Sequence, residues 1–258
     1  MKEQLTIVKV GGKIVEDEKS LNNLILKFKL IPGKKILVHG GGRSATQMAE
    51  QLGIQTSMVD GRRITDREML KVVTMVYGGL INKNIVAKLQ SSGINAIGLT
   101  GADGDVMRAH KREVGDVDYG YVGDIDSVNS LLLSQLMYSE LVPVMAPLTH
   151  DGRGSLLNTN ADTIASSCAL ALTEFFQVSL IYCFEKRGVL SDASDNNSVI
   201  DKITPQLFKK LVADEVVEGG MIPKLENAFS ALNKGVEKVI ITSVDQLSSS
   251  GGTSIKLD

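Results

Sequence analysis

The sequence contains no tryptophan, and aromatic residues make up only 4% of its 258 residues. Its 28 lysine and arginine residues are nearly balanced by 30 aspartate and glutamate residues, which gives a formal net charge of −2. A protein that binds nucleic acid needs a basic surface, and one that binds single strands also needs aromatic side chains on which bases stack. The composition therefore predicts no nucleic-acid partner and favours a small-molecule ligand.

Cysteine is also scarce, with two residues in the whole chain, Cys168 and Cys183. Both lie in apolar segments, and they do not form a CxxC pair. This spacing argues against a disulfide framework or a zinc site and is typical of a protein from a reducing compartment. We interpret the two thiols as core residues and expect a cytoplasmic location.

Long hydrophobic segments are missing as well. The most apolar stretch, residues 131–148, is interrupted by Gln135 and Glu140. The first residues, MKEQLTIVKVGG, include Glu3 and reach two glycines before the apolar core of a signal peptide could form. We therefore expect neither a membrane span nor a signal peptide.

What the chain does contain is a regular alternation of strand and helix patterns. Leu21, Leu24, Ile25 and Phe28 have helical spacing, as do the apolar residues of 161–172. Short apolar segments bounded by glycine or polar residues predict strands, at residues 5–10, 34–40, 94–101, 141–147, 178–184 and 237–243. This order predicts an α/β fold with a parallel sheet covered on both faces, whose ligands bind beyond the carboxyl ends of the strands.

A division near residue 175 separates four predicted strands from two, and each group has its own glycine-rich turns. We expect one continuous domain made of two lobes, residues 1–175 and 176–258. No internal repeat or low-complexity linker separates them.

The first predicted strand contains a lysine, Lys9, and ends in Gly11 and Gly12. A lysine is rarely buried in a strand unless an anion neutralises it, and glycine lets a ligand approach the backbone closely. This combination points to a phosphate at the strand end. The alternative is that Lys9 extends from an edge strand into water.

The second predicted strand runs into His39 and three glycines, residues 40–42, at the start of a helix. Glycine allows backbone amides to converge on an anion, and a helix N-terminus adds a partial positive charge. Neither the GxGxxG nor the GxxxxGK[ST] pattern is present. The turn is therefore either an unclassified phosphate loop or a tight structural connection, and we interpret His39 as structural.

Arg62 and Arg63 precede a helix that Thr65 or Asp66 can cap. A guanidinium group binds a carboxylate through two parallel hydrogen bonds, so one arginine of the pair is a candidate for an acidic substrate. The alternative is that both are solvated. The stretch GDVDYGYVGDI, further along the chain, has the composition of a hairpin.

Two later motifs bring further charge to helix starts. Asp162 follows Asn158 in LNTNADTIA and is either a helix cap or a carboxylate that holds cationic side chains. In EGGMIPKLENA, Pro223 suits a first helical turn and places Lys224 near the positive helix end, where an anion would compensate the repulsion. Two lysines and two glycine turns around one polyanion describe phosphoryl transfer.

Taken in order, the motifs VKVGGK, HGGG, DGRRIT, GYVGDI, LNTNADTIA, RGVL and GGMIPKLENA resemble those of the acetylglutamate kinases, within the amino acid kinase family. The match extends from about residue 5 to the last residues and keeps the order and spacing of the motifs. The resemblance implies an open αβα sandwich. Its N-terminal lobe would bind the acyl amino acid and its C-terminal lobe ATP, with Mg²⁺ held mainly by the nucleotide phosphates and not by protein ligands.

The resemblance also implies roles for individual residues. Lys9 and Lys224 would stabilise the transferring phosphoryl group, and Asp162 would hold their ammonium groups in register. The acyl amino acid would contact Gly41, Gly42, Arg63 and Asn158, with Arg63 on its α-carboxylate because the family's arginine stands two residues after the glycine, here Gly61. The nucleotide would contact Lys9, Gly11, Gly12, Glu185, Gly188 and Gly220, with the amides of Gly11, Gly12 and Gly42 on the phosphates.

Two features depart from the family pattern. Glu185 stands where the family has an aspartate, so the carboxylate is kept on a longer side chain. Lys9 lies so near the first residue that no extra N-terminal helix precedes it, and such helices accompany arginine-inhibited hexamers in the family. We therefore expect a homodimer that arginine does not inhibit.

Three alternatives stay open at this point. Arg62, beside the proposed substrate arginine, would suit a second carboxylate, so an N-succinyl-L-glutamate substrate competes with the acetyl compound unless Arg62 faces solvent. A sibling carbamate kinase or other amino acid kinase is a second alternative. A non-catalytic nucleotide or amino-acid sensor on the same fold is the third, although it has no need to keep Lys9, Lys224 and Asp162.

Overall fold

The structure is a computed structural model and describes residues 2–59, 61–247, 249 and 251–258. At its centre lies an eight-stranded sheet with the order β12-β14-β13-β11-β1-β2-β8-β5. Its strands are β1 (Glu3–Val10), β2 (Lys34–His39), β5 (Ala96–Leu99), β8 (Val142–Met145), β11 (Phe176–Phe184), β12 (Lys202–Ile203), β13 (Lys238–Ser243) and β14 (Thr253–Ile255). Neighbouring strands are parallel except β13 and β14, which run in opposite directions.

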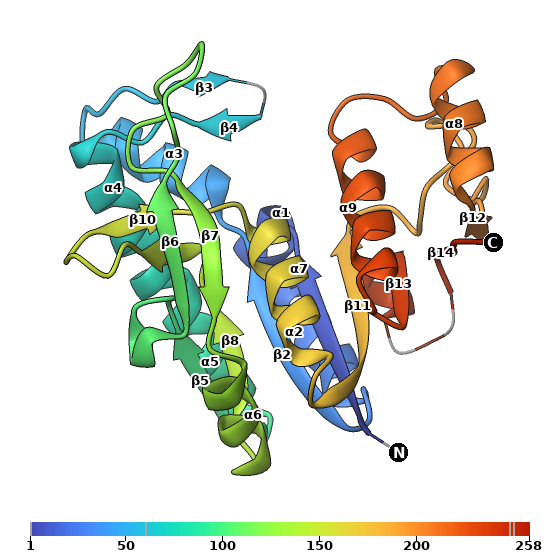
Figure 1. Ribbon diagram of the computed structural model, residues 1–258, viewed down its shortest axis with the longest axis horizontal. Helices are drawn as coiled ribbons and strands as arrows, with labels where there is room; N and C mark the ends of the chain where they lie inside the picture. The colour runs from blue at the N-terminus through green and yellow to red at the C-terminus, as the bar shows by residue number, and fades with distance from the viewer. Residues whose placement is uncertain (1, 60, 248, 250) are drawn as a thin grey trace.

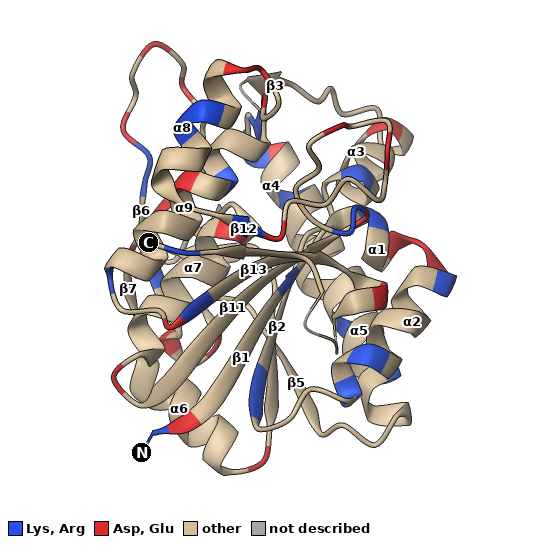
Figure 2. Ribbon diagram, turned by 90° about the vertical axis from the view of Figure 1, so that its right-hand side faces the viewer, with Lys and Arg blue, Asp and Glu red and all other residues tan. Residues whose placement is uncertain are grey.

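Helices cover both faces of this sheet (Figure 2). One face packs against α6 (Ser130–Tyr138), α7 (Ala161–Leu172), α8 (Pro205–Ala213) and α9 (Met221–Asn233). The other packs against α1 (Gly12–Glu16), α2 (Glu18–Lys29), α3 (Gly42–Gln51), α4 (Arg67–Val73), the π-helix η1 (Thr74–Ile81), α5 (Asn82–Ser91) and the short 3₁₀ turn η3 (Val244–Gln246). The expected αβα sandwich around a mainly parallel sheet is confirmed.

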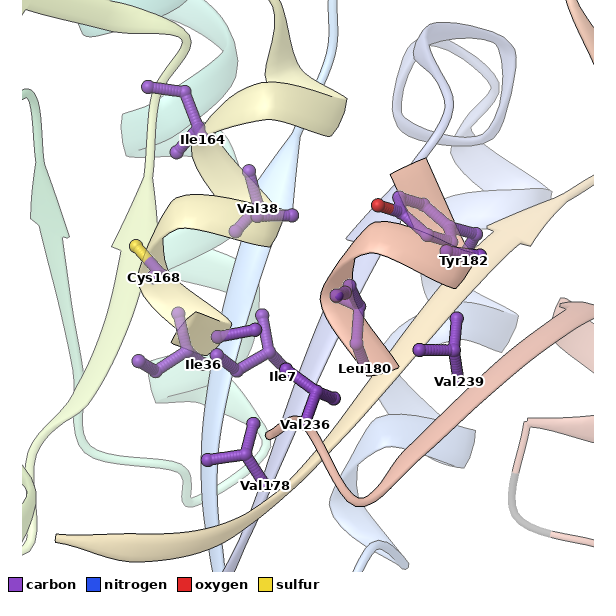
Figure 3. Close-up of a cluster of buried hydrophobic side chains, with 14 of the residues drawn as sticks. Ile7, Ile36, Val38, Ile164, Cys168, Val178, Leu180, Tyr182, Val236 and Val239 are labelled. Carbon is purple, nitrogen blue, oxygen red and sulfur yellow. The ribbon is translucent and has the colours of Figure 1, made fainter. Parts of the chain in front are cut away.

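Alternation along β1 explains why Lys9 lies where it does. Leu5 and Ile7 belong to the apolar cluster on the α7 and α9 face, whereas Val8 and Val10 belong to the cluster on the opposite face. Because successive side chains of a strand point to opposite faces, Lys9 lies on the same face as Leu5 and Ile7, at the carboxyl end of the strand. Figure 3 shows Ile7 within that apolar cluster.

A second, smaller layer lies beside the main sheet (Figure 1). It is a four-stranded sheet of β6 (Met107–Lys111), β7 (Gly123–Val128), β9 (Leu148–His150) and β10 (Leu156–Asn158), in the order β10-β9-β6-β7. The 3₁₀ turn η2 (Asp103–Asp105) precedes it, and a short hairpin of β3 (Met58–Val59) and β4 (Arg62–Arg63) completes the set. The hairpin-like stretch of the sequence connects β6 to β7, which pair antiparallel.

All six predicted strand segments form strands of the main sheet, namely β1, β2, β5, β8, β11 and β13. The predicted helix 161–172 coincides with α7, and the four apolar residues with helical spacing are buried on α2. Residue 175 falls between α7 and β11, and β1 pairs with β2 on one side and β11 on the other. Strands from both predicted lobes thus belong to one sheet. In the described part of the chain, no helix is long and apolar enough to cross a membrane.

Both cysteines are free and buried, Cys168 in α7 and Cys183 in β11. Burial raises the pKa of each thiol to about 12, so neither is a thiolate near neutral pH. Figure 3 shows the Cys168 sulfur among the apolar side chains that fill the space between α7 and the sheet. The interpretation of both as core thiols is confirmed.

Candidate active site

Three charged side chains from distant parts of the chain meet at the carboxyl end of β1. Asp162 Oδ1 lies 2.8 Å from Lys9 Nζ, and Asp162 Oδ2 lies 3.4 Å from Lys224 Nζ. The carboxylate is 13% exposed, and the lysines are 14% and 29% exposed. One aspartate therefore holds two ammonium groups side by side in a partly buried position, as the sequence predicts.

Local structure places each of the three. Asp162 occupies the first turn of α7, but Asn160 is the cap of that helix, because its side chain accepts hydrogen bonds from the amides of Asp162 and Thr163. The carboxylate of Asp162 is therefore free to bind the lysines. Of the two roles that the sequence left open for Asp162, the structure shows the one that holds cationic side chains and not the helix cap. Lys224 follows Pro223 in the first turn of α9. Both helices point their positive N-terminal ends at this site.

The electrostatics of the cluster favour the charged form of Asp162. Burial by itself would raise the pKa of this carboxyl group, but the ammonium groups of Lys9 and Lys224 outweigh that effect and lower the pKa below its usual value. The group carries a net positive charge of one, because two ammonium ions face one carboxylate. It attracts an anion and holds no proton-accepting base near neutral pH.

The two glycine turns pack directly against each other next to this cluster. A Cβ atom on Gly12 would lie 3.3 Å from the backbone nitrogen of Gly41, and one on Gly41 would lie 2.3 Å from Ile81 Cδ1. Neither position has room for a larger residue without displacing its neighbours. The Gly40 amide donates to the Val10 carbonyl at 3.1 Å, which ties the second turn to the end of β1.

Not every glycine amide proposed for phosphate is available. The Gly11 amide donates to the Cys183 carbonyl at 3.1 Å and so continues the ladder between β1 and β11. Gly12 and Gly42, by contrast, are the first residues of α1 and α3, where the backbone amides have no partner within the helix. These two remain the candidates for phosphate contacts.

His39 stabilises the second glycine turn, residues 40–42. It is fully buried, its Nδ1 donates to the Gly40 carbonyl at 2.8 Å, and its Nε2 accepts from Asn82 at 3.2 Å. Burial lowers its pKa to about 4, so the ring is neutral at physiological pH. The structural interpretation of His39 is confirmed.

A cavity of about 210 Å³ opens on the side of the second glycine turn. All four residues predicted for the acyl amino acid line it: Gly41, Gly42, Arg63 and Asn158. Ala161 and Thr163, which flank Asp162, line it too, so the cavity ends beside the ion cluster. Lys9, Asp162 and Lys224 do not themselves line the cavity.

Arg63 is 8% exposed, and only half of its guanidinium group is satisfied. Its Nη2 donates to the Gly42 carbonyl and to Thr46 Oγ1, both at 2.8 Å. Its Nη1 is buried and has no hydrogen-bond partner within the described residues. A buried N–H group without an acceptor is costly, so this atom is ready to bind a carboxylate in the cavity. Asn158 Nδ2 donates to Thr65 Oγ1 at 3.0 Å.

Sequence reasoning missed Tyr77, Arg112 and Asp124, which also line this cavity. Arg112 directly follows β6, and Asp124 lies in β7, so the hairpin brings them over the site. The only local signal was the charged segment around Arg112, which reads equally well as a solvated turn. The sequence did not decide whether Arg62 faces solvent or the substrate. In the structure Arg62 is exposed and also lines the cavity.

A second cavity, of about 670 Å³, is lined by residues within 184–221. Gly188 lines it and is tightly packed, because a Cβ atom there would lie 2.7 Å from Thr253 Oγ1. Met221, one turn before Lys224 in α9, also lines it, next to Gly220 at the helix N-terminus. Glu185 does not line this cavity, and its carboxylate lies 3.6 Å from Lys13 Nζ.

Comparison with known proteins agrees with this geometry. The sequence model of the amino acid kinase family matches residues 4–243. The chain belongs to the amino acid kinase family. It is 63% identical over 256 residues to the acetylglutamate kinase of Phocaeicola vulgatus and 61% identical over 256 residues to that of Bacteroides fragilis. These alignments cover 99% of this chain and 100% and 98% of the two relatives.

Solved structures with the same fold are also found. The crystal structure of smu.665 from Streptococcus mutans UA159 superposes with a TM-score of 0.80 at 26% identity, over 98% of this chain and 99% of that one. The carbamate kinase of Giardia lamblia, at 13% identity and a TM-score of 0.66, shares the fold.

Proposed function

We propose that this chain transfers the γ-phosphoryl group of ATP to the γ-carboxylate of N-acetyl-L-glutamate, a step of arginine biosynthesis. One observation carries the proposal: Asp162 holds Lys9 and Lys224 together, next along the chain to residues that line a cavity with an unsatisfied arginine and a second, larger cavity. The full-length identity to acetylglutamate kinases supports the same reaction.

In this proposal each lobe binds one of the two substrates. Residues 1–175 bind the acyl amino acid, which the first cavity supports because its lining falls within residues 40–163. Residues 176–258 bind ATP, which the second cavity supports because its lining falls within residues 184–221. Arg63 Nη1 binds the α-carboxylate, and the γ-carboxylate points toward Lys9 and Lys224.

The chemistry follows from the charges of the cluster. A γ-carboxylate oxygen of the acceptor attacks the γ-phosphorus of ATP, and the bond from that phosphorus to the bridging oxygen of ADP breaks, which yields an acyl phosphate. The acceptor is already ionised near neutral pH, so the reaction needs no general base. Lys9 and Lys224 neutralise charge that shifts onto the phosphoryl and leaving oxygens, and Asp162 keeps them in position.

We assign Mg²⁺ to the nucleotide phosphates, where it supplies further neutralisation of the phosphate charge. In the described residues, no group of three or more acidic, histidine or cysteine side chains is placed to hold a metal ion, and Asp162 is already paired with two lysines. Magnesium commonly keeps several water ligands and binds through substrate phosphates, so a magnesium ion on the nucleotide needs no cluster of protein ligands.

The assembly and the location are part of the proposal. We propose a homodimer, as the resemblance of the motifs implies, and Met75 and Leu80 of η1, each about half exposed, are candidates for its interface. Two free thiols with no disulfide support a cytoplasmic location.

The test is acyl phosphate formation, trapped as the hydroxamate with hydroxylamine, together with ADP release. We expect both products when ATP and N-acetyl-L-glutamate are present together, and neither product when one of the two is left out. A non-catalytic sensor would bind both compounds in calorimetry without turnover, and a carbamate kinase would release ADP with carbamate instead. Either of these results contradicts the proposed function.

A further inference from the structure

The cavity that Arg63 lines holds more positive charge than the proposed acceptor needs. Among the lining residues that the structure describes, the charged ones are Arg62, Arg63, Arg112 and Asp124. Asp124 neutralises one of the three guanidinium groups, and the α-carboxylate of the substrate neutralises a second. One positive charge is left over, at a distance from the γ-carboxylate that faces Lys9 and Lys224.

Arg112 has a free hydrogen-bond donor in addition to its charge. Its Nε and Nη2 donate to the two carboxylate oxygens of Asp124, at 3.0 and 2.5 Å, which holds the guanidinium plane fixed. Its Nη1 is buried and has no hydrogen-bond partner in the described part of the chain. Arg112 thus repeats the arrangement of Arg63, with one side of the fork anchored and the other side open.

Arg62 adds a second cation to the same place. Arg62 precedes Arg63 in β4, and its side chain lines the same cavity as Arg112 and Asp124. Met58, Val122 and Pro147 line the same cavity and offer apolar contacts between these arginines and the glycine turn. This is the chemistry that binds a short methylene chain ending in a carboxylate.

We propose that Arg112 and Arg62 form a subsite for a carboxylate on the acyl group, so that the preferred acceptor is an N-acyl-L-glutamate with an acidic acyl chain, of the succinyl type. The inference rests on the proposed function and deepens it. A neutral acetyl group leaves Arg112 Nη1 without an acceptor, whereas a terminal carboxylate satisfies it and neutralises the remaining charge.

The experiment compares kcat/KM for three acceptors: N-acetyl-L-glutamate, N-succinyl-L-glutamate and N-butanoyl-L-glutamate. The butanoyl compound matches the succinyl chain in length but lacks its carboxylate, so it separates charge from size. We expect the succinyl compound to exceed the other two by about tenfold or more, the value of a charge-assisted hydrogen bond in a partly buried site.

Two variants and one control locate the effect. Arg112→Gln and Arg62→Gln should each reduce the ratio of succinyl to acetyl efficiency about tenfold, and the exposed position of Arg62 ensures that at least one variant folds. Arg108→Gln is the matched control, because Arg108 lies on β6 and binds the carboxylate of Asp105 but does not line the cavity. It should leave the ratio unchanged.

Binding measured by calorimetry distinguishes failure of the subsite from failure of the proposed function. Turnover of the acetyl compound with no binding of the succinyl compound overturns the subsite and leaves the proposed function standing. Tight binding of the succinyl compound that requires Arg112, without turnover of any acceptor, supports the subsite and overturns the proposed function. A succinyl preference that persists in both arginine variants also overturns the subsite.

Discussion

At the scale of single residues, the charge of Asp162 is the one that its neighbours most clearly maintain. Its carboxylate is only 13% exposed, yet it keeps its charge because two ammonium groups lower its pKa. Burying such a group without partners would cost several kcal/mol, so its position between Lys9 and Lys224 demands a function that uses all three. Charge shift during phosphoryl transfer is such a function.

We predict that Lys9→Ala and Lys224→Ala each lower kcat about a hundredfold or more, while KM for the acyl amino acid changes little. The loss corresponds to about 3 kcal/mol, as for removal of one donor that acts mainly in the transition state. Steady-state kinetics with Arg63→Ala provides the contrast, because loss of the α-carboxylate contact should mainly raise KM. Unchanged kcat in either lysine variant would falsify the catalytic assignment.

At the scale of elements, the cap at the start of α7 both stabilises this helix and positions a residue of the site. Asn160 caps this helix by accepting hydrogen bonds from the amides of Asp162 and Thr163, and so it sets the direction in which Asp162 points. Asn129 caps α6 in the same manner, by accepting from the Leu132 amide, but α6 contributes no residue to either cavity. The two helices therefore form a matched pair.

We expect Asn160→Ala and Asn129→Ala to lower the free energy of unfolding by similar amounts, about 1 kcal/mol each. Only Asn160→Ala should also lower kcat, by about tenfold, because the carboxylate between the lysines loses its fixed position. Urea denaturation and steady-state kinetics on the same samples give both values. An equal loss of kcat in the two variants would show that general stability, and not the position of Asp162, matters.

At the scale of the whole molecule, the buried neutral His39 makes stability depend on pH. Its pKa is about 4 in the folded protein, against about 6.5 in an unfolded chain, because burial disfavours the charged ring. Between these two values the unfolded chain binds more protons than the folded one. The contribution of His39 is therefore fully present above pH 6.5 and is lost as the pH falls toward 4.

We predict that His39 alone reduces the free energy of unfolding by about 2 kcal/mol between pH 7 and pH 5. Urea denaturation at the two pH values measures this, and His39→Asn should remove that part of the pH dependence. His110→Asn is the control of opposite sign, because the hydrogen bond and charge of Asp126 raise the pKa of His110, so its stabilisation is present at low pH and lost as the pH rises. Equal pH slopes for the parent and His39→Asn would contradict the prediction.

The sequence by itself determined six of the eight strands of the main sheet. Apolar segments bounded by glycine or polar residues are local patterns with a direct physical cause, so β1, β2, β5, β8, β11 and β13 follow from them. The grouping of Asp162 with Lys9 and Lys224 was implied by the resemblance of the motifs to a known family, and the structure brings the three side chains together. The short strands β3, β4, β6, β7, β9, β10, β12 and β14 were not predicted, because such short segments have too little pattern of their own and form only through pairing with other strands.

Only the tertiary structure decided which groups are free to bind a ligand. The Gly11 amide is occupied by the Cys183 carbonyl, and Arg112 enters the cavity because β6 pairs with β7 and β9. Both facts depend on contacts between residues far apart in the chain. A local pattern specifies which donors and charges exist, whereas long-range pairing decides which of them are already satisfied and which remain open.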